Sequence, residues 1–277
     1  MIKEMSVDEY NRFRQLLEKN SGILLGDGKE YLVTSRLRRL MEREALHSVT
    51  ELMSAMDRNR SLMENVVDAM TTNETLWFRD DHPYRIFRER LLPEIAAQRR
   101  PLKIWSSACS TGQEPYSLSI EIEDFKKKNP GQLMSGERIL ATDISPSSLQ
   151  AAKDGVYQQL AIRRGMNDQH LKSYFETVDE DRWRINNQIK SRVEFRQQNL
   201  QQSFSLLGKF DIIFCRNVLI YFSSDLKYDI LKRMHASLNP GGYLMLGASE
   251  AMNNLGDYFE MVQCHPGIVY RAKKSSG

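Results

Sequence analysis

Apolar positions in the first 70 residues follow the spacing that is typical of helices. In the first segment they recur every three or four residues, at Val7, Tyr10, Phe13, Leu16 and Leu17. This period predicts one buried helical stripe. Three glycines interrupt the pattern within residues 21–30, and a second helix is predicted over 31–44. The pattern therefore predicts a small all-helical domain over residues 1–70.

Serine–glutamate pairs mark candidate helix starts in this domain. In a capping box, a serine hydroxyl accepts the backbone N–H three residues later, and a glutamate at that later position accepts the serine's own N–H. The candidate pairs are Ser6 with Glu9, Ser48 with Glu51, and Ser61 with Glu64. We expect a helix to begin after each serine.

Beyond residue 101, short apolar runs alternate with longer amphipathic segments. Strands are predicted at 102–108, 138–144, 193–199, 210–216 and 241–249, and helices around 113–128, 145–153 and 224–238. This alternation predicts an α/β domain over 102–277, with a mostly parallel, doubly wound sheet that binds ligands at the carboxyl ends of its strands. Residues 71–101, rich in arginine, form the linker between the two domains.

Two segments of the α/β domain lack a crossover helix. Residues 258–264 and 267–272 lie close together in the chain, which predicts a closing antiparallel hairpin. A second hairpin is expected around Asn186 and Asn187, between residues 183–185 and a strand beginning at 189, because asparagine tolerates turn conformations. We expect this second hairpin to form a small inserted β-subdomain at about 176–195.

Charge and cysteine content narrow the class of protein. The formal net charge is only +3, from 39 basic and 36 acidic residues, which does not favour a nucleic acid or an anionic membrane as partner. The three cysteines and five histidines show no short ligand spacing, so we expect neither disulfides nor a metal site. The N-terminus has no apolar run of signal-peptide length, and a cytoplasmic protein without membrane insertion is expected.

Small side chains fill the predicted turn after the first strand. Residues 106–112 read SSACSTG and include Ala108 and Gly112. A turn this bare lets a ligand approach backbone N–H groups at the start of a helix. Because it has one glycine where a dinucleotide fingerprint has three, a nucleoside ligand fits better than a pyrophosphate.

Polar residues follow the first two strands and allow two interpretations each. Asp143, at the end of the second strand, could accept hydrogen bonds from both hydroxyls of a ribose, or could be an acidic residue stabilised by the next helix dipole. Glu114 could bind an amino-acid ammonium group, or could be an ordinary first-turn glutamate.

The third and fourth strands bring further polar residues to the same edge. Asn199 and Leu200 could bind and pack against an adenine, although an asparagine ending a strand is common in any case. Arg216, Asn217 and Tyr221 come directly after an apolar strand, where a buried arginine and asparagine need hydrogen-bond partners.

Short stretches of the sequence, taken in order, resemble one enzyme family. They are TTNETLWFRD (71–80), WSSACSTGQEPYS (105–117), ATDIS (141–145), QNL (198–200) and FCRNVLIYF (214–222). The chain is identified as a member of the chemotaxis receptor glutamate methyltransferases, the CheR family, over essentially its whole length. The resemblance implies a Rossmann-like class I methyltransferase fold after the helical domain. It also implies S-adenosylmethionine as cofactor, S-adenosylhomocysteine as product, and methylation of glutamate side chains on the cytoplasmic helices of chemoreceptors for adaptation.

The resemblance also assigns roles to residues. Carried position by position, the family's cofactor contacts fall on Asn73, Thr75, Arg79, Ala108, Glu114, Asp143, Asn199, Leu200, Arg216 and Asn217. Tyr221 corresponds to the tyrosine beside the reacting methyl group, and Arg79 also lies near the substrate carboxylate. The receptor-docking surface falls on the basic second helix, at Arg36, Arg38, Arg39 and Arg43, which could otherwise be an ordinary solvated face. A monomer is implied, with receptors and regulatory proteins as partners.

One segment departs from many family members. Residues 175–195 are short and lack the glycine-rich turn that binds a pentapeptide at receptor C-termini, so we expect docking on the receptor helices without this tether. Two rival functions stay open on the residues alone. One is a methyltransferase acting on RNA or a small molecule with the same fold, and the other is a module that only binds the cofactor.

Overall fold

The N-terminal region folds into a helical domain with its own core. A computed structural model describes residues 5–250 and 255–274, and its residues 5–70 contain the helices α1 (Val7–Ser21), α2 (Glu30–Arg43), α3 (Val49–Met56) and α4 (Arg60–Met70). Their apolar faces enclose one core. Tyr10, Phe13 and Leu17 are buried in it, as the sequence period predicts, whereas Val7 at the start of α1 is exposed.

The predicted helix caps are partly confirmed. Ser6 and Glu9 form a full capping box, with hydrogen bonds of 3.2 Å and 2.9 Å in the two directions. Ser48 caps α3, but Glu51 accepts the N–H of His47 instead of that of Ser48. The third prediction is wrong, because Asn59 caps α4 two residues before Ser61.

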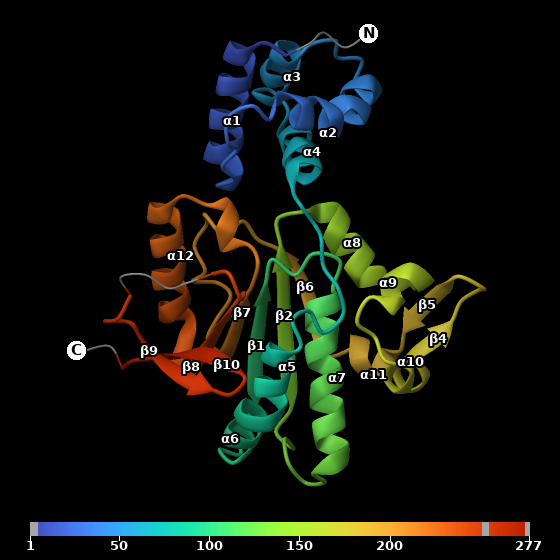
Figure 1. Ribbon diagram of the computed structural model, residues 1–277, viewed down its shortest axis with the longest axis vertical. Coiled ribbons are helices and arrows are strands. Elements are labelled where there is room, and N and C mark those ends of the chain that lie inside the picture. Colours follow the sequence, from blue (N-terminus) through green and yellow to red (C-terminus); the bar gives the residue numbers. More distant parts are fainter. Residues whose placement is uncertain (1–4, 251–254, 275–277) are drawn as a thin grey trace.

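The second domain is built on a mixed sheet at whose carboxyl edge the helical domain sits (Figure 1). In the described chain the sheet has seven strands in the order β6-β2-β1-β7-β8-β10-β9. They are β1 (Leu102–Ser107), β2 (Glu137–Asp143), β6 (Val193–Gln197), β7 (Phe210–Cys215), β8 (Leu238–Leu246), β9 (Phe259–Cys264) and β10 (Gly267–Ala272). The first five strands in this order run parallel, and β10 pairs antiparallel with β8 and β9. The predicted α/β fold and its closing hairpin are therefore confirmed.

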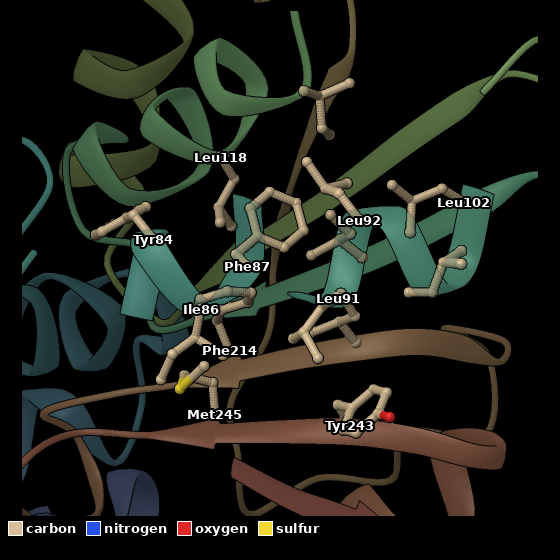
Figure 2. Packing of buried hydrophobic residues seen from close by; sticks show 14 of the residues in the cluster. Tyr84, Ile86, Phe87, Leu91, Leu92, Leu102, Leu118, Phe214, Tyr243 and Met245 are labelled. Carbon is tan, nitrogen blue, oxygen red and sulfur yellow. The ribbon is translucent and has the colours of Figure 1, made fainter. Parts of the chain in front are cut away.

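Helices cover both faces of this sheet. One face packs against α5 (His82–Ile86), the π-helix η1 (Phe87–Leu91), α6 (Leu92–Ala96) and α7 (Gln113–Lys128), whereas α12 (Ser224–Ser237) packs on the other. Side chains alternate along β7: Ile212 and Phe214 join the first core, and Ile213 the second. Figure 2 shows Phe214 with its neighbours Phe87 and Met245. No helix in the described residues is long and apolar enough to cross a membrane.

The small inserted sheet lies earlier in the chain than predicted. In the described chain it contains the strands β3 (Val156–Gln158), β4 (Phe175–Thr177) and β5 (Arg182–Ile185), in the order β3-β5-β4. Its connecting helices are α9 (Gln159–Arg163) and α10 (Asp168–Tyr174). This sheet therefore extends over 156–185 and not over about 176–195.

The predicted hairpin around Asn186 and Asn187 is wrong. The Asn186 side chain caps α11 (Asn187–Lys190) by accepting the N–H of Ile189 at 3.2 Å, so the chain enters a helix where a turn was expected. The following strand, β6, then pairs with β2 in the main sheet.

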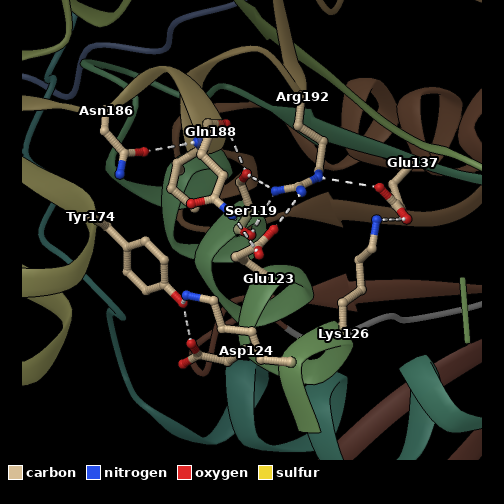
Figure 3. Close-up of polar contacts among 11 residues, drawn as sticks. Ser119, Glu123, Asp124, Lys126, Glu137, Tyr174, Asn186, Gln188 and Arg192 are labelled. Atoms are coloured by element: carbon tan, nitrogen blue, oxygen red, sulfur yellow. Dashed lines mark hydrogen bonds and ion pairs between the residues drawn. The ribbon is translucent and has the colours of Figure 1, made fainter. Parts of the chain in front are cut away.

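A half-buried ion network ties β6 to α7 and β2 (Figure 3). The Arg192 guanidinium donates to Ser119 Oγ at 2.8 Å, to Glu123 Oε2 at 2.9 Å and to Glu137 Oε2 at 3.4 Å. Lys126 Nζ donates to the other oxygen of Glu137 at 2.9 Å. Because the side chains of Arg192 and Glu123 are each only 10% exposed, removing this cation leaves the Glu123 carboxylate poorly solvated and without a cationic partner in the described chain, and leaves Glu137 with Lys126 alone.

We predict that Arg192→Ala lowers the free energy of unfolding by about 3 kcal/mol, as for other partly buried ion pairs that lose one partner. The control is Arg196→Ala, since Arg196 pairs with Glu194 at the surface, with side chains 49% and 61% exposed. Its loss should cost less than about 1 kcal/mol. Urea denaturation of the two variants measures the difference, and equal costs would contradict the role given to the network.

Candidate active site

A pocket lies at the carboxyl ends of the parallel strands, beneath the helical domain. Residues of the sheet, the linker and the α1–α2 segment all line it. Every residue predicted to bind cofactor or to act in catalysis is among the lining: Asn73, Thr75, Arg79, Ala108, Glu114, Asp143, Asn199, Leu200, Arg216, Asn217 and Tyr221. Since they come from distant parts of the chain, the fold brings the whole predicted set together at one place.

The turn from β1 to α7 has a backbone conformation and surroundings that disfavour large side chains. Ala108, Ser110 and Gly112 have φ angles of 57°, 51° and 94°, a region that residues other than glycine seldom adopt. A Cβ on Gly112 would lie 2.9 Å from the Cβ of Ala152 in α8 (Pro146–Asp154). The turn therefore has small side chains for two reasons: its backbone adopts left-handed φ angles, and α8 packs directly against it.

Asp143 holds the turn in place from the end of β2. Its Oδ2 accepts the N–H of Ser110 at 2.7 Å, and its Oδ1 accepts the N–H of Ser145 at 2.9 Å. Burial raises the pKa of the Asp143 carboxyl, and these backbone N–H groups offset only part of the rise. Each oxygen keeps a lone pair for a further donor. The two interpretations from the sequence are thus compatible, because Asp143 anchors the start of α8 and also lines the pocket.

Glu114 and Arg216 form a buried ion pair at the floor of the site. Arg216 Nη1 donates to Glu114 Oε2 at 3.0 Å, and Nη2 donates at 2.8 Å both to Asp80 Oδ2 and to the carbonyl of Arg79. The Arg216 side chain is 2% exposed. Burial raises the pKa of Glu114 against the opposing effect of Arg216. Burial acts to lower the pKa of Arg216, but neighbouring groups, Tyr84 and Glu114 foremost, raise it.

Arg79 is the arginine of the pocket whose guanidinium makes the fewest hydrogen bonds to the described residues. Its Nη1 donates to the carbonyl of Glu74 at 3.1 Å. Within the described residues, no other hydrogen bond or ion pair engages this guanidinium, in contrast to that of Arg216. Arg79 is half-buried and lines the pocket, so it can pair with an anionic group that enters there.

Asn199 has a structural role that the sequence did not indicate. Its Nδ2 donates to the carbonyl of Asn20 in α1 at 2.7 Å, and its Oδ1 accepts the N–H of Gln201 at 2.9 Å. The amide therefore joins the end of β6 to the helical domain. Leu200 is buried beside it and packs in the core under α12.

Asn217 and Tyr221 lie on the loop after β7, which includes the 3₁₀-helix η2 (Leu219–Tyr221). The carbonyl of Tyr221 accepts the N–H of Leu24, in the α1–α2 segment, at 2.9 Å. The Tyr221 hydroxyl makes no hydrogen bond to another described residue, and the side chain lines the pocket. The hydroxyl is therefore available to a ligand.

Sequence reasoning missed Glu250, a buried carboxylate behind this loop. It accepts the N–H groups of Gly247, Asn217, Val218 and Leu219. The residue directly follows the predicted strand 241–249 and lies outside the stretches that resemble the methyltransferase family. No local pattern in the sequence indicates this role, and only the structure shows that a Cβ on Gly247 would come within 2.6 Å of Glu250 Oε2.

The basic residues of α2 divide into two groups. Arg36 lines the pocket and donates to the carbonyls of Met70 and Thr71 and to Thr72 Oγ1. It is thus engaged with the linker and is not part of a free surface. Arg38, Arg39 and Arg43 are exposed and do not line the pocket, and Arg43 pairs with Glu44 at 3.1 Å.

Comparison with known proteins assigns the chain to a family. Residues 73–268 match the CheR methyltransferase, SAM binding domain, and residues 8–71 match the CheR methyltransferase, all-alpha domain. The chain belongs to the CheR methyltransferase family. It is 55% identical to chemotaxis protein methyltransferase 1 of Pseudomonas aeruginosa over 96% of this chain and 98% of that protein. It is 52% identical to chemotaxis protein methyltransferase Cher2 of Pseudomonas putida, over the same shares, and 34% identical to chemotaxis protein methyltransferase of Salmonella typhimurium, over 93% and 88%.

The pocket of this CheR methyltransferase suits its cofactor, S-adenosylmethionine. The cofactor offers two ribose hydroxyls as donors and carries positive charge on its sulfur and its ammonium group. The pocket offers two carboxylates largely withdrawn from water, Asp143 and Glu114, and burial raises the pKa of each although both accept hydrogen bonds from the protein. Donors and positive charge are the groups that such carboxylates need.

Proposed function

We propose that this protein methylates glutamate side chains on the cytoplasmic helices of chemoreceptors, with S-adenosylmethionine as the methyl donor. The observation that carries the proposal is the contrast between Arg79 and Arg216, two of the three arginines that line the pocket. Arg216 is buried and both of its terminal nitrogens are bonded to the protein, whereas Arg79 makes one bond to a carbonyl and pairs with no carboxylate of the described residues, so it can receive a carboxylate. Membership of a family whose relatives are chemotaxis methyltransferases supports a receptor as the source of that carboxylate.

In this proposal the cofactor is held at three places. Asp143 accepts the ribose hydroxyls, Glu114 accepts the ammonium group, and Asn199, Leu200 and Asn217 surround the adenine and its neighbours. Asn73 and Thr75 close the pocket from the linker, Ala108 leaves room at the turn, and Arg216 positions Glu114. These roles are supported by the common position of the residues around one pocket and by the lone pairs that Asp143 and Glu114 retain.

Catalysis then depends mainly on placement. When bound, the cofactor supplies a methyl group on a positively charged sulfur. A glutamate with a pKa of about 4.3 is already ionised at neutral pH, so it needs no general base. Arg79 and Tyr221 orient this carboxylate for in-line attack, an effect that can lower a barrier by about 7 kcal/mol or more. A partial contact from Arg79 leaves the attacking oxygen nucleophilic.

The direct test is incubation of the protein with isotopically labelled S-adenosylmethionine and a receptor cytoplasmic fragment. Mass spectrometry should find base-labile methyl esters on glutamates of the fragment. Total RNA and a protein-free small-molecule extract serve as competing substrates. Label that enters either of those and not the fragment would refute the proposal, and binding of cofactor without transfer would favour a binding module.

We predict that Arg79→Ala lowers kcat by about 100-fold, the loss expected when a reacting group is misplaced. Steady-state assays with the receptor fragment measure it. Arg85→Ala is the matched control, because Arg85 is exposed on α5 and pairs only with Glu89 among the described residues. Wild-type kinetics in Arg79→Ala would remove Arg79 from the mechanism.

We assign receptor docking to the exposed arginines of α2, namely Arg38, Arg39 and Arg43. Arg36 instead binds the helix to the linker through its hydrogen bonds. We predict that the double variant Arg38→Glu/Arg39→Glu raises KM for the receptor fragment about tenfold, because like charges slow encounter with an acidic helix. The affinity for S-adenosylhomocysteine should not change, since neither residue lines the pocket. Arg58→Glu, exposed in the same domain, is the control. Equal KM values for the two variants would place docking elsewhere.

Docking is further proposed to occur without a pentapeptide tether. The turn from β4 to β5 contains Asp179, Glu180 and Asp181 and is closed by a hydrogen bond from Val178 N to Arg182 O at 2.9 Å. It has no glycine. We predict that calorimetric titration with a receptor C-terminal pentapeptide gives no micromolar binding, and a micromolar Kd would show that this turn does bind it.

A further inference from the structure

The loop after β7 is held by one carboxylate from a different part of the chain. Glu250 Oε2 accepts the N–H groups of Asn217 and Gly247 at 2.7 Å and 2.9 Å. Its Oε1 accepts those of Val218 and Leu219 at 2.9 Å and 2.7 Å. All four donors are backbone groups, and no basic side chain in the described residues pairs with Glu250. Glu250 as a whole is 8% exposed, so these amides are the main groups that stabilise the charge of its carboxylate.

The backbone of the loop is shaped to present successive amides to one anion. Asn217 has a φ of 58°, in the left-handed region, and Val218 follows at −125°. A turn of this kind points neighbouring N–H groups into a common concavity, which elsewhere binds external anions. Here the anion belongs to the protein. Without it, three consecutive amides beside a buried strand end would be left without acceptors.

The opposite side of the same loop is the pocket. Arg216, Asn217, Val218 and Tyr221 line it. The loop also carries the carbonyl of Tyr221 that holds Leu24 of the helical domain. A displacement of the loop would therefore move the adenosine-side residue Asn217 and the hydroxyl of Tyr221 together.

We propose that Glu250 is a positioning residue for cofactor binding and methyl transfer. It acts through Asn217 and η2, and it touches neither cofactor nor substrate. The part of this inference that concerns cofactor binding rests on the family assignment and on the proposed place of the cofactor beside Asn217. The catalytic arm rests on the proposed function, so the two can fail separately.

The test compares Glu250→Gln with wild type by calorimetric titration of S-adenosylhomocysteine. The glutamine is nearly isosteric, but its NH₂ group faces two backbone N–H groups and cannot accept from them. Two of the four hydrogen bonds that hold the loop are therefore lost. The Kd should rise about tenfold to a hundredfold, as expected for the loss of hydrogen bonds to a charged group. In the receptor assay kcat should also fall at saturating cofactor. Glu260→Gln, exposed on β9, is the matched control and should bind like wild type.

The stoichiometry of the titration separates positioning from mere folding. If Glu250 only supported the fold, the fraction of binding-competent protein would fall while the Kd of the remainder stayed at the wild-type value, and that result would overturn the proposal. Gly247→Ala gives a second route if Glu250→Gln does not fold. It keeps the carboxylate but crowds it, with a Cβ 2.6 Å from Oε2 and 2.9 Å from Asn217 N. It should weaken binding in the same way, and wild-type affinity in Gly247→Ala would also overturn the proposal.

Discussion

The contact between the buried Arg216 guanidinium and its three acceptors is the interaction on which the site depends. It joins β7, which ends next to it, to α7 through Glu114 and to the linker through Asp80 and the Arg79 carbonyl. Burying such a charge is costly unless it is paired, and both terminal nitrogens are bonded here, although Nε has no partner among the described residues. Here two carboxylates meet one guanidinium, so the cluster retains negative charge beside a pocket for a positively charged cofactor. The same bond to the Arg79 carbonyl fixes the backbone from which the Arg79 side chain extends.

A second constraint is that each strand end around the pocket is bonded to the N-terminal region. The turn after β1 donates from Ser110 Oγ to the carbonyl of Asn73 at 2.8 Å. The segment after β2 contacts Asp68 through Ser145 and Ser147. The ends of β6 and β7 reach α1 and the following segment through Asn199 and Tyr221. The helical domain is thus one wall of the pocket as well as a proposed docking surface.

Much of this arrangement follows from local patterns in the sequence. Alternating apolar runs predict the parallel sheet, and a parallel sheet necessarily gathers Glu114, Asp143 and Asn217 at one edge. Assignments failed where a competing cap was better placed: Asn59 precedes Ser61, and Asn186 starts a helix where a turn was predicted. The roles of Arg36, Asn199 and Glu250 depend on partners 34 or more, 179 and up to 33 positions away, respectively. No periodicity within a single segment reports such pairs.

The shared wall also constrains how this enzyme can be rebuilt. The segment after α1 contributes Ile23, Leu24 and Leu25 to the pocket and bonds to the loop after β7. Gly22 sits so close to Leu226 that a Cβ there would approach within 2.6 Å. A chimera that takes its helical domain from a distant homologue therefore also replaces part of the pocket wall, so the residues at the contact between the two domains have to be exchanged together.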